Sequence, residues 1–283
     1  MSIEIQFTKM HGCGNDFVVI DNRMQILQEE EINDFVQTVC ERKFHIGANG
    51  VMLVEESERA DVKMRYFNAD GSEGEMCGNG ARCFAKFSHE LNMVEAAMTM
   101  ETLDGLYDAQ VMVDGNVQIS FPEIALNNVH LNKQLVNGEQ IGLYHYIWVG
   151  VPHVVVFGNN ISEIDDAVFA EWAIGVKEQE QFRPHGTNVN LVEICPKTTI
   201  LKIRTYERGV EEETLACGSG ATASAIIASL LGKVNSNVQV ETRGGMLTVD
   251  FTLQNTSIQH ITLKGTAVTV FTGMIQKEGD CDA

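Results

Sequence analysis

The sequence has few basic residues. Its 283 residues include 20 Lys and Arg against 39 Asp and Glu, which gives a formal net charge of −19. Nucleic acids and anionic membrane surfaces are bound through basic patches, so this charge argues against either as a main partner. It leaves open a small zwitterionic ligand, which local groups can hold. Hydrophobic residues make up 44% of the chain and charged residues 21%, as is typical of a globular protein with a buried core.

Long hydrophobic runs are also missing. The most apolar stretch, residues 221–231, is interrupted by Thr and Ser and is much shorter than the ~20 residues that span a bilayer. The first residues, 1–4, have neither the basic start nor the apolar run of a secretory signal peptide. We therefore expect a cytoplasmic protein without a membrane segment.

The seven cysteines lack any zinc or redox spacing. No two form a C-x-x-C pair, and no histidine stands at zinc-finger spacing from such a pair. Neither a structural zinc site nor a thioredoxin-like motif is indicated, and we expect no metal. The odd number of cysteines and the length of the chain favour reduced thiols. Most of them fit the ordinary role of a small buried hydrophobic side chain.

Two cysteines, Cys77 and Cys217, do not fit that role, because both begin the motif C-G-x-G-A. Each follows a polar stretch and precedes a helix-like run, over residues 82–91 and 222–231. The two cysteines lie 140 residues apart (217 − 77), which is half the length of the chain. A repeat at this spacing predicts two related halves, each presenting one cysteine at the N-terminus of a helix.

A C-G-x-G motif at a helix start suits the binding of an anion beside a thiol. Its glycines let the backbone approach a ligand closely. The first amides of a helix have no acceptor within the helix and can bind a carboxylate. The same positive helix end lowers the pKa of a thiol. Two such ends would hold one α-carboxylate, with a sulfur on either side of the α-carbon.

That arrangement suits inversion of an amino acid at its α-carbon. Inversion requires a base on one face to remove the α-proton and an acid on the opposite face to return one. A thiolate and a thiol supply both, and the aligned amides stabilise the charge that develops. No lysine with a pyridoxal signal stands out in the sequence, so we expect no cofactor.

Around these motifs the chain resembles the diaminopimelate epimerase family, whose members use two cysteines and no pyridoxal cofactor. Cys13 lies where a leucine is more usual in that family. The resemblance covers most of the chain and rests on the segments 7–17, 67–72, 76–83, 186–190, 206–210 and 213–220. These segments are specific for the family. They decide the substrate less firmly, because amino-acid racemases and isomerases share the scaffold.

The resemblance implies an α/β (α+β) fold of two pseudo-symmetric domains, each a β-barrel-like sheet around a central helix, with the active site in the interdomain cleft. We expect the first domain at residues 1–121, joined by a C-terminal strand at 266–283, and the second at 122–265. Short β-branched segments in the sequence are compatible with this fold. Further helix-like runs occur at 29–41 and about 162–172.

The resemblance also implies roles for particular residues. Cys77 and Cys217 would be the catalytic pair. The substrate would be bound by Asn15, Asn68, Gly78, Asn79, Asn188, Glu207, Arg208, Gly218 and Ser219. Taken singly, the asparagines could equally be turn residues, and Arg208 with Glu207 a surface ion pair.

Some of these roles are more specific. Arg208 would bind the distal carboxylate of the substrate through its forked guanidinium, and Glu207 the distal ammonium. His153, together with Glu207, would tune the thiols. Phe271 lies where the family often has a tyrosine at a dimer contact, so the resemblance implies a homodimer.

The implied reaction is interconversion of LL- and meso-2,6-diaminopimelate, in lysine and peptidoglycan biosynthesis, with Cys217 as proton acceptor and Cys77 as donor for the LL isomer. The alternatives are a racemase of histidine, glutamate or lysine, or a non-catalytic amino-acid-binding or thiol-redox module. Three departures from the family pattern bear on the substrate. Val151 replaces a common asparagine, Asn49 and Gly50 replace Asp and Gln, and the loop after Val210 is one residue longer.

Overall fold

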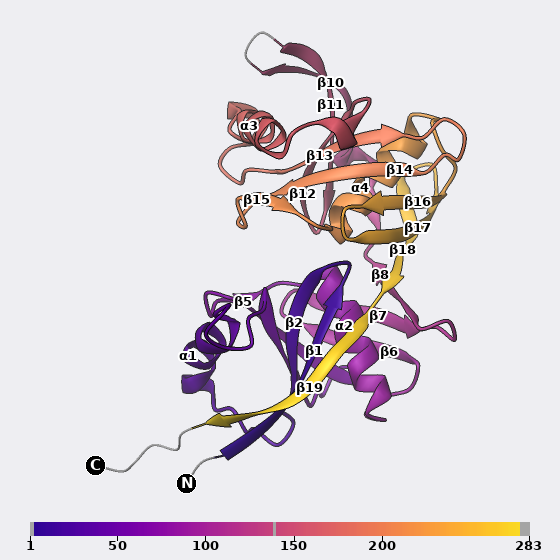
Figure 1. Ribbon diagram of the computed structural model, residues 1–283. Helices are drawn as coiled ribbons and strands as arrows, with labels where there is room; N and C mark the ends of the chain where they lie inside the picture. Colours follow the sequence, from indigo (N-terminus) through magenta and orange to yellow (C-terminus); the bar gives the residue numbers. More distant parts are fainter. Residues whose placement is uncertain (1–2, 138–139, 278–283) are drawn as a thin grey trace. The chain divides into compact units, whose positions relative to one another are not determined.

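The computed structural model describes residues 3–137 and 140–277 (Figure 1). Contacts divide the chain into two compact units, Met1–Ile119 with Thr266–Ala283, and Ser120–Gly265. Residues 278–283 of the expected C-terminal strand lie outside the described residues, as does Cys281. Within the described residues, none of the other six cysteines forms a disulfide bond.

The first unit contains a curved sheet and two helices. Its helices are α1 (Glu29–Cys40) and α2 (Gly78–Glu90). Its strands are β1 (Ile3–Gly12), β2 (Asn15–Asp21), β3 (Gly50–Glu55), β4 (Val62–Asn68), β5 (Glu73–Gly74), β6 (Ala97–Thr102), β7 (Gly105–Val111), β8 (Asn116–Phe121) and β19 (Val268–Lys277).

The second unit has the same kinds of element. Its α-helices are α3 (Asp166–Lys177) and α4 (Gly218–Leu230). Short 3₁₀ turns lie at Leu126–Asn128, Ile161–Glu163 and Glu180–Phe182. Its strands are β9 (Ile124–Ala125), β10 (His130–Asn137), β11 (Gln140–Val149), β12 (Val151–Phe157), β13 (Asn188–Ile194), β14 (Leu201–Glu207), β15 (Glu212–Thr214), β16 (Asn237–Thr242), β17 (Gly245–Leu253) and β18 (Ser257–Thr266).

The two units repeat one strand order. In the first unit the order is β19–β1–β2–β3–β4–β6–β7–β8, and only the pairs β2/β3 and β4/β6 are parallel. In the second it is β10–β11–β12–β13–β14–β16–β17–β18, with the parallel pairs β12/β13 and β14/β16 at matching places. The described residues therefore form two related halves, as the repeated cysteine motif predicts.

A central helix fills each sheet (Figure 1). In the first unit α2 packs against β1, β2, β3, β4 and β7, and in the second α4 packs against β11 to β14, β16 and β17. Most residues of both helices are buried, on every side of the helix. A helix that is apolar or small all round belongs inside a core. The sheet must therefore curve around it, which places the first turn of each helix, and its cysteine, at one end of the barrel-like sheet.

A second helix covers the outer side of each sheet. Helix α1 packs on β3 and β4, and α3 on β10, β13 and β14. This double cover explains why β3 and β13 are buried along almost their whole length. The sequence pattern placed the third helix at 162–172, about four residues too early. Asp165 is its N-cap and accepts from the Ala167 amide at 2.9 Å, while residues 161–163 form a separate 3₁₀ turn.

No helix in the described part of the chain is long and apolar enough to cross a membrane. The same ranges contain no group of three or more His, Cys, Asp or Glu side chains that could hold a metal ion.

Candidate active site

Cys77 is the N-cap of the central helix α2. Its backbone is extended (φ −107°, ψ 114°), and the helix begins at Gly78. The Cys77 carbonyl accepts from the Ala81 amide at 2.7 Å and so closes the first turn. The amides between them have no acceptor within the helix. The sulfur of Cys77 therefore lies at a positive helix end, which favours a thiolate and a bound anion.

Asn15 lies beside this cysteine. Its Nδ2 is 3.7 Å from Cys77 Sγ. It begins β2 directly after a tight turn, in which Cys13 and Gly14 both have positive φ (53° and 85°). Since the turn fixes where β2 starts, it also fixes the amide that faces the sulfur.

Two other predicted site residues of the first unit, Asn68 and Asn79, form hydrogen bonds in the loops around the helix start. Asn79 is 2% exposed, and its Oδ1 accepts from Arg82 at 2.8 Å. Asn68 ends β4, and its Nδ2 donates to Ser72 Oγ at 3.1 Å. Asp70 accepts from the same hydroxyl at 2.6 Å. Their side chains thus shape the backbone from which the first amides of α2 project.

Cys217 repeats the geometry of Cys77 in the second unit. It is the N-cap of α4, with nearly the same backbone angles (φ −113°, ψ 115°). Its Sγ accepts from the Gly220 amide at 3.4 Å and lies 3.5 Å from Ser219 Oγ. The residue is only 6% exposed. Gly218 and Ser219 therefore occupy the first turn of α4, as Gly78 and Asn79 do in α2.

Glu207 is the carboxyl group that contacts Cys217. Burial raises the pKa of Glu207, while hydrogen bonds from the Thr214 hydroxyl and from Cys217 lower it. The Thr214 hydroxyl donates to Glu207 Oε1. A carboxylate that accepts from a thiol opposes loss of that thiol's proton.

His153 lies in a fully buried polar chain behind the first turn of α4. Its Nδ1 is 3.2 Å from Asn190 Nδ2, and the Asn190 amide nitrogen also donates to the Val154 carbonyl at 2.9 Å. The Asn190 Oδ1 accepts from Thr205 Oγ1 at 2.9 Å. Because Asn190 donates to Nδ1, the ring proton is on Nε2, which has no partner among the described residues. Burial lowers the pKa of His153 to about 3.

Asn190 and Thr205 were given no role by sequence analysis. Asn190 lies within the segment 186–190 that resembles the family. A signal existed in Gly220, because a Cβ at this position would collide with Asn190 Oδ1 and come within 3.2 Å of Thr205 Oγ1. The glycine of the second C-G-x-G motif thus makes room for a buried amide as well as for a ligand.

The buried imidazole should make folding stability depend on pH. An unfolded His titrates near pH 6.5, but the folded His153 titrates near 3, so the unfolded state binds an extra proton between these values. Stability should therefore fall as pH falls from about 6.5 towards 3, by up to about 1.4 kcal/mol per pH unit. Urea unfolding from pH 7 to pH 5 would measure this. A His153→Gln variant should lose that part of the slope, and an unchanged slope would contradict the assignment.

Arg208 and Asn188 form a second group near the same end of the unit. The Asn188 side chain is buried and accepts from the Arg208 amide at 2.8 Å. The Arg208 guanidinium is exposed and donates to the His185 carbonyl at 2.5 Å. No carboxylate in the described residues forms an ion pair with it, so the surface ion pair considered above is not what holds it. Its exposed, unneutralised charge suits an anionic ligand.

Strand packing accounts for the departure at Gly50. A Cβ on Gly50 would collide with the Phe67 carbonyl across the β3/β4 pair. Asn49 exchanges hydrogen bonds with Asp16, with its side-chain oxygen accepting from the Asp16 amide at 3.2 Å. The longer loop after Val210 is held by Glu211, whose carbonyl accepts from the Tyr206 hydroxyl at 2.6 Å.

Phe271 lies on β19 and is 46% exposed. Its ring packs edge to face on Phe7 of β1, with 5.8 Å between the ring centroids. Val270 and Met274 on the same strand are also exposed. The predicted dimer contact therefore falls on an exposed apolar strand.

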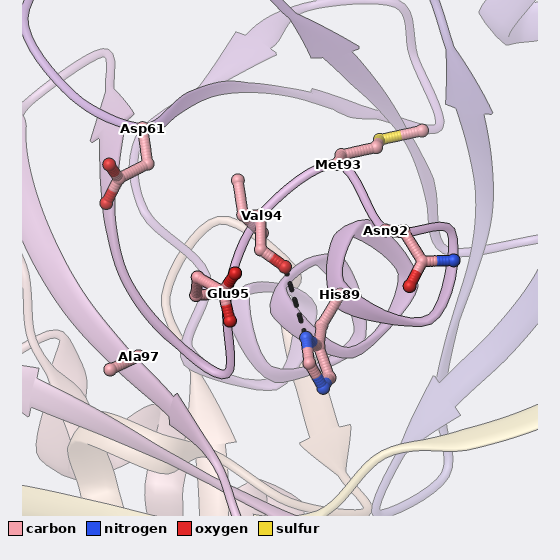
Figure 2. A pocket seen from close by; sticks show the side chains of 7 residues that line it. All are labelled: Asp61, His89, Asn92, Met93, Val94, Glu95 and Ala97. Atoms are coloured by element: carbon pink, nitrogen blue, oxygen red, sulfur yellow. Dashed lines mark hydrogen bonds between the residues drawn. The ribbon is translucent and has the colours of Figure 1, made fainter.

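A separate pocket lies at the opposite end of α2 from Cys77 (Figure 2). His89 points into it, with Nδ1 3.1 Å from the Val94 carbonyl. The pocket is lined by Asp61, His89, Asn92, Met93, Val94, Glu95 and Ala97. None of the predicted site residues is among them, so this pocket is not the candidate active site.

Comparisons with known proteins support one family. The sequence matches the family model for diaminopimelate epimerase over residues 7–123 and 145–270. It is 39% identical to the diaminopimelate epimerase of Flavobacterium psychrophilum, over 93% of this chain and 97% of that one. It is also 39% identical to the diaminopimelate epimerase of Aquifex aeolicus, over 97% and 99% of the two chains.

Solved structures confirm the fold. A hydroxyproline epimerase from Agrobacterium vitis superposes with a TM-score of 0.72 at 15% identity, covering 98% of this chain and 94% of that chain. A PhzF-family phenazine biosynthesis protein from Bacillus anthracis gives a TM-score of 0.70 at 19% identity, covering 96% and 99%. At such low identity these likenesses concern the fold alone. From the near full-length sequence matches, we conclude that the chain belongs to the diaminopimelate epimerase family.

Proposed function

We propose that this protein is a diaminopimelate epimerase, which interconverts LL- and meso-2,6-diaminopimelate for lysine and peptidoglycan biosynthesis. The observation that carries the proposal is the pair of equivalent cysteines at the N-termini of α2 and α4, in a chain that belongs to this family. The substrate is a small zwitterion, which is compatible with the acidic chain.

The proposed chemistry is a two-base proton transfer. For the LL isomer, the Cys217 thiolate takes the α-proton, and the electron pair of the broken C–H bond stays on the α-carbon. The Cys77 thiol then donates its proton to the opposite face. The product has the inverted configuration, Cys217 is a thiol and Cys77 a thiolate, and the meso-to-LL direction uses the same groups in reverse.

The helix ends supply the electrostatic stabilisation. The first amides of α2 and α4, at Gly78, Asn79, Gly218 and Ser219, would bind the α-carboxylate. They act while negative charge builds up next to it, without a cofactor. Asn15, Asn68 and Asn188 would position the substrate.

The distal end of the substrate is assigned to the second unit. Arg208 would bind the distal carboxylate with its exposed guanidinium. Glu207 would serve the distal ammonium and, with His153, set the protonation of Cys217. We further propose that the enzyme works in the cytoplasm as a homodimer that buries Phe271.

A substrate panel tests the proposed function. Purified enzyme would be incubated in heavy water with LL- or meso-diaminopimelate, and separately with histidine, glutamate and lysine. Chiral chromatography with mass spectrometry should show epimerised, deuterated diaminopimelate and at least 100-fold slower reaction of the other amino acids. Faster racemisation of histidine, glutamate or lysine would replace the substrate assignment. If the reduced protein incorporated no deuterium into any of these amino acids, the proposed epimerase activity would be excluded.

A further inference from the structure

Arg82 is a fully buried cation below the Cys77 loop. It lies in α2, five residues after Cys77, and is 0% exposed. Its Nη1 donates to the Gly78 carbonyl at 3.1 Å, and its Nη2 to Asn79 Oδ1 at 2.8 Å. Its Nε donates to the Thr266 carbonyl at 3.3 Å. The guanidinium is thus hydrogen-bonded to both residues that follow the cysteine.

All of these acceptors are neutral. Among the described residues, no carboxylate lies within ion-pair distance of Arg82. The nearby carboxylates are engaged elsewhere: Asp16 pairs with Lys9 at 2.6 Å, and Asp104 accepts from the Met76 amide at 3.3 Å. A buried charge without a counterion is strongly unfavourable. We therefore expect an anion close to the loop that Arg82 holds.

Cysteines are the remaining candidates for that anion. Burial raises the pKa of Cys83 to about 12, so this side chain stays a thiol. Cys13 Sγ is 3.8 Å from Arg82 Nη2 and 4.0 Å from Thr266 Oγ1, but Cys13 lies in the turn between β1 and β2 and is not the N-cap of a helix. Cys77 is the N-cap at the positive end of α2, and the guanidinium is hydrogen-bonded to the two residues that follow it. The other titratable groups on the strands packed against α2 are Glu4, Lys9, His11, Asp16, Asp21, Glu55, Lys63, Arg65, Tyr66, Tyr107 and Asp108.

The second unit lacks this charge. The residue five positions after Cys217 is Thr222, whose hydroxyl donates to the Gly218 carbonyl at 3.0 Å. The Thr222–Gly218 hydrogen bond of the second unit corresponds to the Arg82–Gly78 bond of the first, but its donor is neutral. Cys217 also donates to the Glu207 carboxylate. The two helix starts therefore match in backbone, but different charged groups contact them: the buried Arg82 guanidinium donates to Gly78 and Asn79 in the first turn of α2, and the Glu207 carboxylate accepts from Cys217.

We propose that Arg82 is a positioning residue that holds Cys77 as the thiolate in the free enzyme, while Cys217 carries the proton. In this form Cys77 is the base and Cys217 the acid, which are the roles assigned above to the meso-to-LL direction. This inference rests on the proposed function for its meaning, but its test needs no substrate, so the two can fail separately.

The test is the pH dependence of thiol alkylation in the free enzyme. Iodoacetamide modification of Cys77 and Cys217 would be followed by peptide mass spectrometry from pH 5 to 10. In the unaltered protein, the midpoint for Cys77 should lie at least one pH unit below that for Cys217. A midpoint for Cys77 equal to or above that for Cys217 would overturn the proposal, and this comparison requires no change at Arg82.

Substitutions then assign the effect to Arg82. Arg82→Met should raise the Cys77 midpoint by at least one pH unit, which is a tenfold loss of thiolate near neutral pH, and leave Cys217 unchanged. Arg82→Lys, which keeps the charge, should restore most of the shift, and Arg82→Gln replaces Met if that variant does not fold. Thr222→Val is the matched control and should not move Cys77. No shift in Arg82→Met or Arg82→Gln would refute the proposal, as would a Cys13→Ala variant that alone removes the low midpoint.

Discussion

Replacing either Cys77 or Cys217 with alanine should lower kcat for epimerisation of diaminopimelate by at least about 1,000-fold, within the range known for loss of a general acid or base. The expectation follows from the two equivalent N-cap positions, each with its sulfur at a positive helix end. Each direction of the reaction needs one sulfur to take a proton and the other to give one. Neither variant should therefore catalyse epimerisation in either direction, LL to meso or meso to LL.

A matched control, Cys195→Ala, distinguishes loss of a catalytic thiol from the general effect of removing a cysteine. Cys195 follows β13 in a turn of the second unit and is partly exposed, and its backbone forms the hydrogen bonds that close that turn. Cys195→Ala should keep near-normal kcat. The rates would be measured by chiral chromatography, with circular dichroism to establish that each variant is folded. A folded Cys77→Ala or Cys217→Ala variant that keeps a tenth of normal kcat would contradict the two-base mechanism.

Gly220→Ala should disrupt the Cys217 half-site, whereas Gly80→Ala at the equivalent position of the first unit should be mild. At Gly220 the new Cβ meets Asn190 Oδ1, which is fixed by its hydrogen bonds to Thr205 and His153. At Gly80 the nearest atoms are the terminal Cε and Sδ of Met52, at 3.2 Å. A methionine tip can move aside, but a buried amide in a hydrogen-bonded chain cannot.

The expected magnitudes differ accordingly. Gly220→Ala should cost about 2–3 kcal/mol of unfolding free energy, as overpacking of a core does, and lower kcat/KM by at least 100-fold because the start of α4 shifts. Gly80→Ala should cost less than about 1 kcal/mol. Urea unfolding and steady-state kinetics on the pair would measure both. Equal effects of the two substitutions would show that the Asn190 chain does not support the Cys217 loop.

Local sequence patterns predicted the backbone structure at the two cysteines. The repeated C-G-x-G-A motif predicts that Cys77 and Cys217 lie at helix starts. An N-cap depends only on neighbouring residues, here the glycines and the helix-forming run that follows, so a local pattern is enough to predict it. Both cysteines have that geometry. The strands around them were also indicated, since buried strands such as β3 are short and β-branched.

Contacts between distant parts of the chain could not be predicted in this way. The His153–Asn190 hydrogen bond joins residues 37 positions apart, and the Arg82–Thr266 bond residues 184 apart. Each depends on which strands become neighbours, which a local pattern does not specify. Asn68 is a local case. A single asparagine in such a segment is typical of a turn, and the Asn68 side chain does donate a hydrogen bond to Ser72 in the turn that follows β4.

The central claim is that two thiols act on opposite faces of one α-carbon, and the fate of the α-hydrogen in heavy water tests it most directly. Unlabelled LL-diaminopimelate would be converted to no more than a few per cent, and both isomers would be separated and analysed by mass spectrometry. The two-base mechanism predicts one solvent-derived deuterium in nearly every meso product molecule, and almost none in the remaining LL substrate. Product that keeps the substrate's own hydrogen, or deuterium appearing equally fast in both isomers, would point to a single base and contradict the account.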